Sequence, residues 1–223
     1  MIFYRPTNRE VYTDPVKYKP RTCFIMTQLG GKLPEQVIEI RKELTKYLDS
    51  YSISEVDASS FVTGGDFLIK IWDIIISVPF GIAIVTEGMK ESTLSNIFYE
   101  IGLLNSLGKE TIIIKSKDYK IPSDFIRTEY IEFNNQFSNN IKKFLNNVFE
   151  LAEHYELMSD LLEKNPVLSI DYLRRAYLIT NDIEFKNKAR DIYKKNSFDS
   201  QSKFFVKNFI NMKEKRPTTK AHT

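Results

Sequence analysis

The chain has little of what several common classes of protein depend on. Its 223 residues include one cysteine, Cys23, and two histidines, His154 and His222. A single cysteine excludes an internal disulfide and suits a reducing compartment. The histidines lie far apart in the sequence and have no ligand spacing with Cys23, so we expect no metal site. No Ser-His-Asp arrangement can be placed either.

Long apolar runs and a strong net charge are also missing. No apolar stretch approaches the roughly 20 residues that a membrane-spanning helix needs, and residues 1–6 lack the apolar core of a signal peptide. The net charge is +3, too small to indicate a nucleic-acid-binding protein. Hydrophobic residues make up 42% of the chain and charged residues 27%, as in ordinary globular proteins. We therefore expect a cytoplasmic protein that binds neither a membrane nor nucleic acid.

What the chain does have is an alternation of short apolar runs and amphipathic segments. Strands are predicted at residues 23–26, 52–56, 81–85, 111–115 and 130–133. Helices are predicted between the first four of them, at residues 35–48, 67–78 and 92–107. This alternation is typical of βαβ units in a parallel sheet with right-handed crossovers. Five strands suit an α/β, flavodoxin-like sheet of order 2-1-3-4-5, in which a ligand lies over the carboxyl ends of the first and third strands.

Outside this region the sequence changes character. Residues 1–21 are rich in Tyr, Pro and Arg and are predicted to form an extended arm. The strands stop after residue 133, and residues 134–212 keep a helical period that predicts an all-α extension. From residue 183 to the end there are 11 Lys and Arg against 4 Asp and Glu, and residues 213–223 are predicted to be a disordered basic tail. The α/β domain is thus expected at residues 22–133.

Residues 92–114 break two local rules at one place. Apolar side chains recur there at helical spacing, at Leu94, Ile97, Ile101, Leu104 and Leu107. Glu100 lies inside this apolar run and Gly102 follows it, although a carboxylate near a core and a glycine within a helix both cost stability. A local conflict of this kind is a good place to look for function. We expect Glu100 early in its helix, facing the crevice at the strand ends.

The segment Asn96-Ile97-Phe98-Tyr99-Glu100-Ile101-Gly102, followed by Leu107-Gly108-Lys109 and a strand, resembles a family signature. It is similar to that of the nucleoside 2-deoxyribosyltransferase-like proteins and of the bacterial Toll/interleukin-1-receptor-like (TIR-like) nucleotide-binding domains. The resemblance covers roughly residues 22–133 and is closest over residues 96–114. It implies that Glu100 acts at the anomeric carbon of a nucleoside or of NAD, which would be the substrate, with no cofactor.

The chemistry of such a reaction suits a partly buried carboxylate. Breaking an N-glycosidic bond builds positive charge on the sugar, in a transition state that resembles an oxocarbenium ion. A carboxylate can stabilise that charge or attack to form a covalent glycosyl-enzyme intermediate. The alternative is that Glu100 is an exposed glutamate that only favours the helix.

Further candidates lie in the loops at the predicted carboxyl edge. Tyr99 is a candidate catalytic residue that would shape the pocket of Glu100. Asp57 and Asp66 are candidates to protonate the leaving base or to hold the ribose hydroxyls, and Asp66 is also a natural helix N-cap. The remaining candidate substrate-binding residues are Thr27, Gln28, Gly30, Gly31, Thr86 and Asn96. The loop of Gln28 could equally be a plain turn, because it lacks a full phosphate-binding glycine motif.

Two classes of function remain open. Transferases of the family usually have a clearer aspartate between the third strand and the glutamate, and this chain offers only Glu87 and Glu91 there. That difference favours hydrolysis of the N-glycosidic bond or binding alone over transfer. The first possibility is a nucleoside or NAD glycosidase, which the resemblance associates with antiphage defence. The other is a non-catalytic nucleotide-binding sensor or adaptor, with the C-terminal helices mediating self-assembly or contacting a sensor protein.

Overall fold

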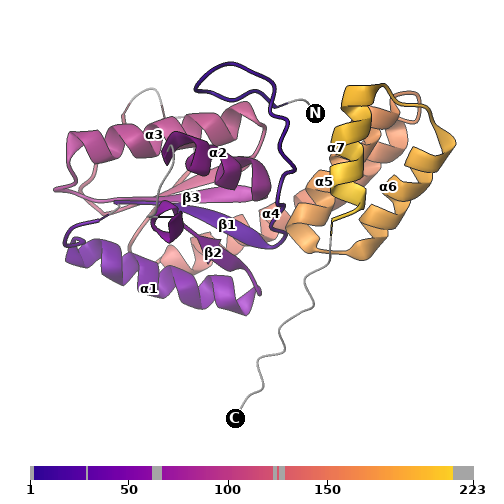
Figure 1. Cartoon of the computed structure of the whole chain (residues 1–223). Helices are drawn as coiled ribbons and strands as arrows, with labels where there is room; N and C mark the ends of the chain where they lie inside the picture. The colour runs from indigo at the N-terminus through magenta and orange to yellow at the C-terminus, as the bar shows by residue number, and fades with distance from the viewer. Residues whose placement is uncertain (1–2, 29, 62–66, 123–124, 126–128, 213–223) are drawn as a thin grey trace, which may run out of the picture.

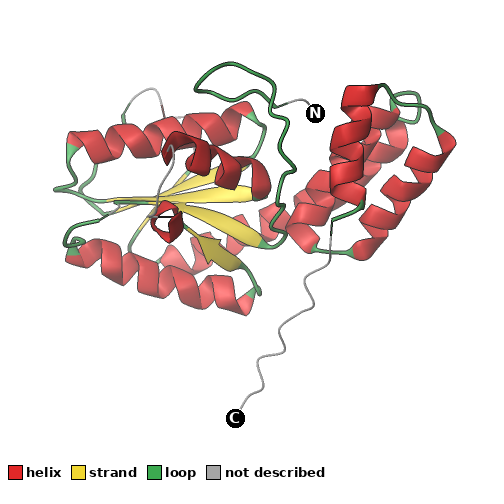
Figure 2. Cartoon of the chain, in the orientation of Figure 1, coloured by secondary structure: helices red, strands yellow, loops and turns green. Residues whose placement is uncertain are grey.

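The computed structural model describes residues 3–28, 30–61, 67–122, 125 and 129–212. At its centre lies a five-stranded parallel sheet of order β2-β1-β3-β4-β5 (Figure 2). The strands are β1 (Thr22–Met26), β2 (Ser54–Val56), β3 (Phe80–Val85), β4 (Glu110–Lys115) and β5 (Tyr130–Glu132). The predicted α/β, flavodoxin-like fold is confirmed, including the strand order that reverses between β1 and β3.

Helices cover both faces of the sheet. One face carries α2 (Phe67–Ser77) and α3 (Glu91–Ser106), and the other carries α1 (Glu35–Ser50) and α4 (Phe137–Leu161) (Figure 1). The ring of Phe80 in β3 packs edge-on against Phe144 of α4 at 6.0 Å between ring centroids. Every residue of β1 and β3 is buried. This double covering explains why the central strands are continuous apolar runs rather than alternating ones.

The C-terminal part of the chain is helical, as expected. After α4 come α5 (Pro166–Thr180), α6 (Ile183–Lys195) and α7 (Ser200–Ile210), and a short 3-10 helix, η1 (Ala58–Phe61), follows β2. Helix boundaries match the predicted ones to within a few residues. The prediction that the second strand begins at residue 52 is wrong, because Ser52 has a φ of +53° and belongs to the turn after α1. Among the described residues no helix is long and apolar enough to cross a membrane.

The N-terminal arm lies along the side of the sheet domain and reaches the helical extension (Figure 1). Its buried side chains are Phe3, Tyr12, Val16 and Tyr18. The Phe3 ring lies edge-on to Phe205 of α7 at 5.9 Å, and Tyr18 packs in the same way on Phe209 at 6.3 Å. The arm therefore joins the two parts of the chain through aromatic contacts, which also bury much of its own apolar surface.

Gly81 and Gly102 differ in how much space a side chain would have at each position. A Cβ atom on Gly81 in β3 would lie 2.5 Å from Cδ1 of Leu104 and 2.9 Å from Cε of Met26, so α3 can rest on the sheet only because this residue has no side chain. Gly102, on the exposed side of α3, has no other atom within 4 Å of such a Cβ atom. Close packing therefore explains Gly81 and does not explain Gly102.

This contrast gives a prediction on stability. Gly81→Ala should lower the free energy of unfolding by about 1–3 kcal/mol, because α3 would be pushed from the sheet. Gly102→Ala should raise it by about 0.5–1 kcal/mol, because alanine favours a helix more than glycine does. Urea denaturation of the two variants measures both changes. Equal effects of the two substitutions would contradict the packing that we describe.

Candidate functional site

Glu100 is a buried acid without a partner. Its side chain is 6% exposed, and it makes no hydrogen bond or ion pair with any residue that the structure describes. Burial raises its pKa from the usual 4.5 to about 8. Glu100 is therefore largely protonated at neutral pH in the unliganded protein, and a cationic group bound beside it would favour the charged form. The alternative of an exposed glutamate that only favours the helix is wrong.

The position of Glu100 along α3 differs from the expected one. It lies beyond the midpoint of the helix rather than early in it. Leu104, one turn further on, rests over Gly81 near the start of β3, so Glu100 lies over the middle of that strand. Side chains of a helix lean toward its N-terminus, and the N-terminus of α3 follows the carboxyl end of β3. The Glu100 side chain is thus expected to lean toward the carboxyl edge of the sheet from within the packed layer.

Two buried hydroxyl groups without partners mark that edge. Thr27 directly follows β1 and is 5% exposed, and Thr86 directly follows β3 and is fully buried. Neither Oγ1 atom has a hydrogen-bond partner among the described residues, although such partners are the rule for buried polar groups. Both residues lie where the strand order reverses, which is where ligands bind in open parallel sheets.

The two threonines and Glu100 do not lie on the same face of the sheet. The Cβ position of Gly81 contacts Leu104 and Met26, so these residues face α3. Side chains alternate along a strand. Continued by one residue past the ends of β1 and β3, this alternation places Thr27 and Thr86 on the face that α1 and α4 cover. A ligand would contact both threonines and Glu100 only by lying across the edge of the sheet.

Tyr99 and Asn96 lie in solvent rather than around the Glu100 carboxyl group. Tyr99 is 48% exposed and Asn96 is also exposed. Between them in the helix, Phe98 turns inward and stacks on Phe125 at 4.5 Å between ring centroids. The structure therefore brings Asn96 and Tyr99 to the surface of α3, where they could contact a bound molecule but do not enclose Glu100.

Arg41 and Ser59 are among the residues that hold Asp57. Its Oδ2 atom accepts a hydrogen bond from the guanidinium of Arg41 at 2.5 Å, and its Oδ1 atom accepts one from the backbone N–H of Ser59 at 3.1 Å. Burial alone would raise the pKa of Asp57, but the hydrogen bonds from Ser59 and Arg41 outweigh it and hold the pKa below its usual value. Asp57 is ionised at neutral pH, so it can accept hydrogen bonds from ribose hydroxyls but is poorly suited to protonating a leaving base.

The first loop is a glycine turn. Gly30 and Gly31 have φ angles of +71° and +68°, which favour glycine. A Cβ atom on Gly30 would meet no other atom within 4 Å, so the backbone conformation rather than a close approach requires it. The Gln28 amide donates to the Gly30 carbonyl at 3.4 Å, which is long for a hydrogen bond. Asp66, including its expected role as an N-cap, lies outside the described residues.

Sequence reasoning missed two residues near this site. Arg41 lies on α1, and its pairing with Asp57 joins residues 16 positions apart; the available signal was an arginine beside the apolar stripe of that helix. Trp72 on α2 is 5% exposed, and its indole N–H has no hydrogen-bond partner within the described part of the chain. Because α2 packs against α3, Trp72 provides a buried donor on the helix next to Glu100.

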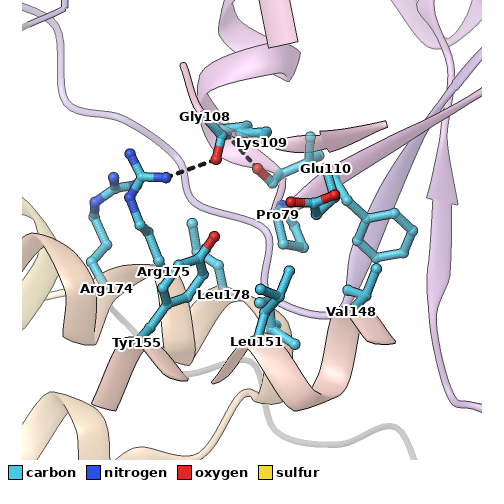
Figure 3. A pocket seen from close by; sticks show the side chains of 13 residues that line it. Pro79, Gly108, Lys109, Glu110, Val148, Leu151, Tyr155, Arg174, Arg175 and Leu178 are labelled. Carbon is cyan, nitrogen blue, oxygen red and sulfur yellow. Dashed lines mark hydrogen bonds between the residues drawn. The ribbon is translucent and has the colours of Figure 1, made fainter. Parts of the chain in front are cut away.

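The Gly108-Lys109 pair lies at the opposite, amino edge of the sheet and has a structural explanation (Figure 3). The partly buried Lys109 side chain donates to the carbonyl oxygens of Ile75, at 2.6 Å, and Val78. The Arg175 guanidinium of α5 donates to the Gly108 carbonyl at 2.9 Å. The small cavity beside these groups, about 20 Å³, is close to the size of a single water probe.

Comparison with known protein families, with curated proteins and with solved structures gives no match. The class of the protein therefore rests on its own fold and site. It is a flavodoxin-like α/β protein with a helical extension. At and near the point where its strand order reverses it has buried polar groups without partners among the described residues. The described residues contain no group of three or more His, Cys, Asp or Glu that could hold a metal ion.

The raised pKa of Glu100 predicts how stability depends on pH. Unfolded Glu100 releases its proton near pH 4.5, whereas the folded protein keeps that proton to about pH 8. Raising the pH between these values therefore favours the unfolded state. Relative to Glu100→Gln, the free energy of unfolding of the natural protein should fall across this window by a few kcal/mol, at most about 5.

The measurement is urea denaturation of both proteins at several pH values from 4.5 to 8.5. Glu91→Gln is the matched control, because Glu91 lies exposed in the first turn of the same helix. Its curve should stay parallel to that of the natural protein. If the Glu100→Gln curve stays parallel as well, Glu100 does not titrate as an isolated buried acid.

Proposed function

We propose that the protein cleaves the N-glycosidic bond of a nucleoside, a nucleotide or NAD, with Glu100 as the central acid group. The observation that carries this proposal is the buried Glu100 side chain, which has no partner among the described residues and whose pKa is raised to about 8. Such an arrangement costs stability. A positively charged sugar in the transition state, or the nicotinamide cation of NAD, would provide the missing partner.

The reaction would proceed with Glu100 ionised. As the bond between the anomeric carbon and the base nitrogen breaks, its electron pair leaves with the base, and positive charge develops on the sugar ring. The Glu100 carboxylate would stabilise that charge from an environment of low dielectric constant, in which the attraction is strong. Water then adds to the anomeric carbon and loses a proton. The departing base of a nucleoside takes up a proton to become free base, whereas nicotinamide leaves NAD as a neutral molecule and the proton passes to solvent.

The surrounding groups suit the binding of the sugar. Ionised Asp57 can accept hydrogen bonds from ribose hydroxyls, and Arg41 keeps it in place. The buried Thr86 and Thr27 hydroxyls, which lack partners among the described residues, can bind polar groups of a ligand at the strand ends. A role for the protein as a cytoplasmic antiphage effector, with the C-terminal helices forming a homo-oligomer or binding a sensor protein, belongs to the same proposal.

The alternative is a nucleotide-binding sensor that does not cleave its ligand. The exposure of Tyr99 and Asn96 favours it, because these residues do not enclose Glu100 as a catalytic pocket would. In this case the carboxyl group would recognise a positively charged part of the ligand, and the same strand ends would hold the rest of it.

Analysis of the reaction products distinguishes the glycosidase from the non-catalytic sensor. The purified protein is incubated with NAD, adenosine and deoxyadenosine, and free base is measured by chromatography. We expect base release that falls about 100-fold or more in Glu100→Gln, because the variant cannot carry the negative charge, and that is unchanged in Glu91→Gln. Binding of one of these compounds without base release by either protein would establish the sensor instead.

The pH dependence of the rate identifies the active form of Glu100. If the carboxylate stabilises the sugar cation, the rate at low substrate concentration should rise as the pH approaches about 8, where half of Glu100 is ionised in the free protein. A rate that falls across the same range would show instead that the protonated acid is the active form.

A further inference from the structure

A large cavity that Glu100 does not line lies where three elements of the described chain meet. Residues 12–19 of the arm form one wall, residues 70–77 of α2 another, and the end of α7 with the residues after it the third. Its volume is about 740 Å³, within the range of about 300–1,000 Å³ that is typical of small-molecule sites. Figure 1 shows the arm passing between the sheet domain and the helical extension at this place.

The walls combine apolar surface with positive charge. Apolar groups come from Pro15, Val16 and Ile74, and lysine side chains reach the cavity from all three elements. Lys17 of the arm and Lys207 of α7 make no hydrogen bond or ion pair with the residues that the structure describes. Both residues are exposed, and two separate elements thus contribute a lysine to the lining of one cavity.

The acidic groups of the cavity are already engaged. Asp73 accepts a hydrogen bond from the Tyr12 hydroxyl at 2.8 Å, and Asp14 pairs with Arg5 at 2.5 Å. Asp73 also interacts electrostatically with Lys17 and Arg5, so both carboxylates act on groups of the protein itself. Lys19 and Lys70 also have partners within the protein, so Lys17 and Lys207 are the positive groups of the walls that can bind an anion.

We propose that this cavity binds a small anionic molecule with an apolar body, whose carboxylate or phosphate group lies between Lys17 and Lys207. The two ammonium groups hold the anion, and Pro15, Val16 and Ile74 contact the apolar body. The site is separate from that of the proposed glycosidase, since Glu100, Thr27 and Thr86 line no part of it.

Binding would also strengthen the contacts among the arm, α2 and α7. The backbone N–H of Val16 donates to the Asn208 side chain of α7 at 3.1 Å, and that of Lys19 donates to the Ser77 carbonyl of α2 at 2.9 Å. A molecule that contacts all three walls adds a further link between these elements. Because it binds the folded state alone, it raises the melting temperature.

Calorimetric titration of the whole chain tests the proposal, with four probes. Decanoate and AMP carry the two anionic groups on an apolar or aromatic body, decanol has the apolar body alone, and inorganic phosphate has the charge alone. We expect decanoate or AMP to bind with a Kd below about 1 mM, to raise the melting temperature, and to bind at least about tenfold more tightly than decanol and phosphate. Whichever of the two binds identifies the anionic group.

Two variants locate the binding. Lys17→Glu combined with Lys207→Glu should weaken it at least about tenfold, and Asn211→Trp, which adds an indole to the cavity wall, should abolish it. The matched control combines Lys42→Glu with Lys203→Glu, which makes the same charge change at exposed positions outside the cavity. Glu100→Gln should leave the binding unchanged, so that this result is independent of the proposed enzymatic activity.

Several results would contradict the proposed anion site. Absence of binding by both decanoate and AMP overturns the proposal, and so does binding that survives the charge reversal at Lys17 and Lys207. Equal binding of inorganic phosphate would show attraction by diffuse surface charge, and equal binding of decanol would show a purely apolar hollow. Either result rejects a site for an anion with an apolar body.

Discussion

Two partly buried basic side chains, Lys109 and Arg175, bind the ends of two helices and hold them against their neighbours. The last carbonyl groups of a helix carry partial negative charge and lack partners within the helix. Lys109 provides partners at the end of α2, and Arg175 does so for the Leu107 and Gly108 carbonyls at the end of α3. Arg175 is itself held by Asp171 at 3.1 Å. Because Asp171 and Arg175 belong to α5, the same contacts attach the helical extension to the amino edge of the sheet.

Because the helical extension is attached at the amino edge, the carboxyl edge of the sheet is formed by the loops that follow the strands. The backbone N–H of Arg21, just before β1, donates to the Leu178 carbonyl of α5 at 2.8 Å, again at the amino edge. The polar groups without partners among the described residues, Thr27 and Thr86, lie at the other end of the same strands. Stabilising contacts and unsatisfied groups are thus separated along the strands, as expected where one edge stabilises the fold and the other binds a ligand.

The sequence predicted the fold well because apolar periodicity is a local property. Each of the five strands and the helices between them could be read from a short window of residues. The contacts of Lys109 could not, because they reach carbonyl groups more than 30 residues earlier in the chain. The resemblance placed Gly108-Lys109 within a functional signature, whereas the fold gives it a structural role. Asp57 was a candidate from its position after β2, but its lowered pKa depends on Arg41, which the sequence does not place beside it.

At Glu100 the sequence pattern and the structure point to the same unusual feature, a carboxyl group within the apolar core. The sequence marked it as an acid within an apolar stripe, and the structure shows the cost of this position as a pKa raised to about 8. The neighbouring Gly102 has no packing explanation, since an alanine would fit there. A buried acid that served stability alone would be expected to have a partner, as Asp171 has in Arg174 at 2.7 Å. Glu100 has none among the described residues, and a partner from outside the chain, with a positive charge, would lower its pKa and recover the cost of burial.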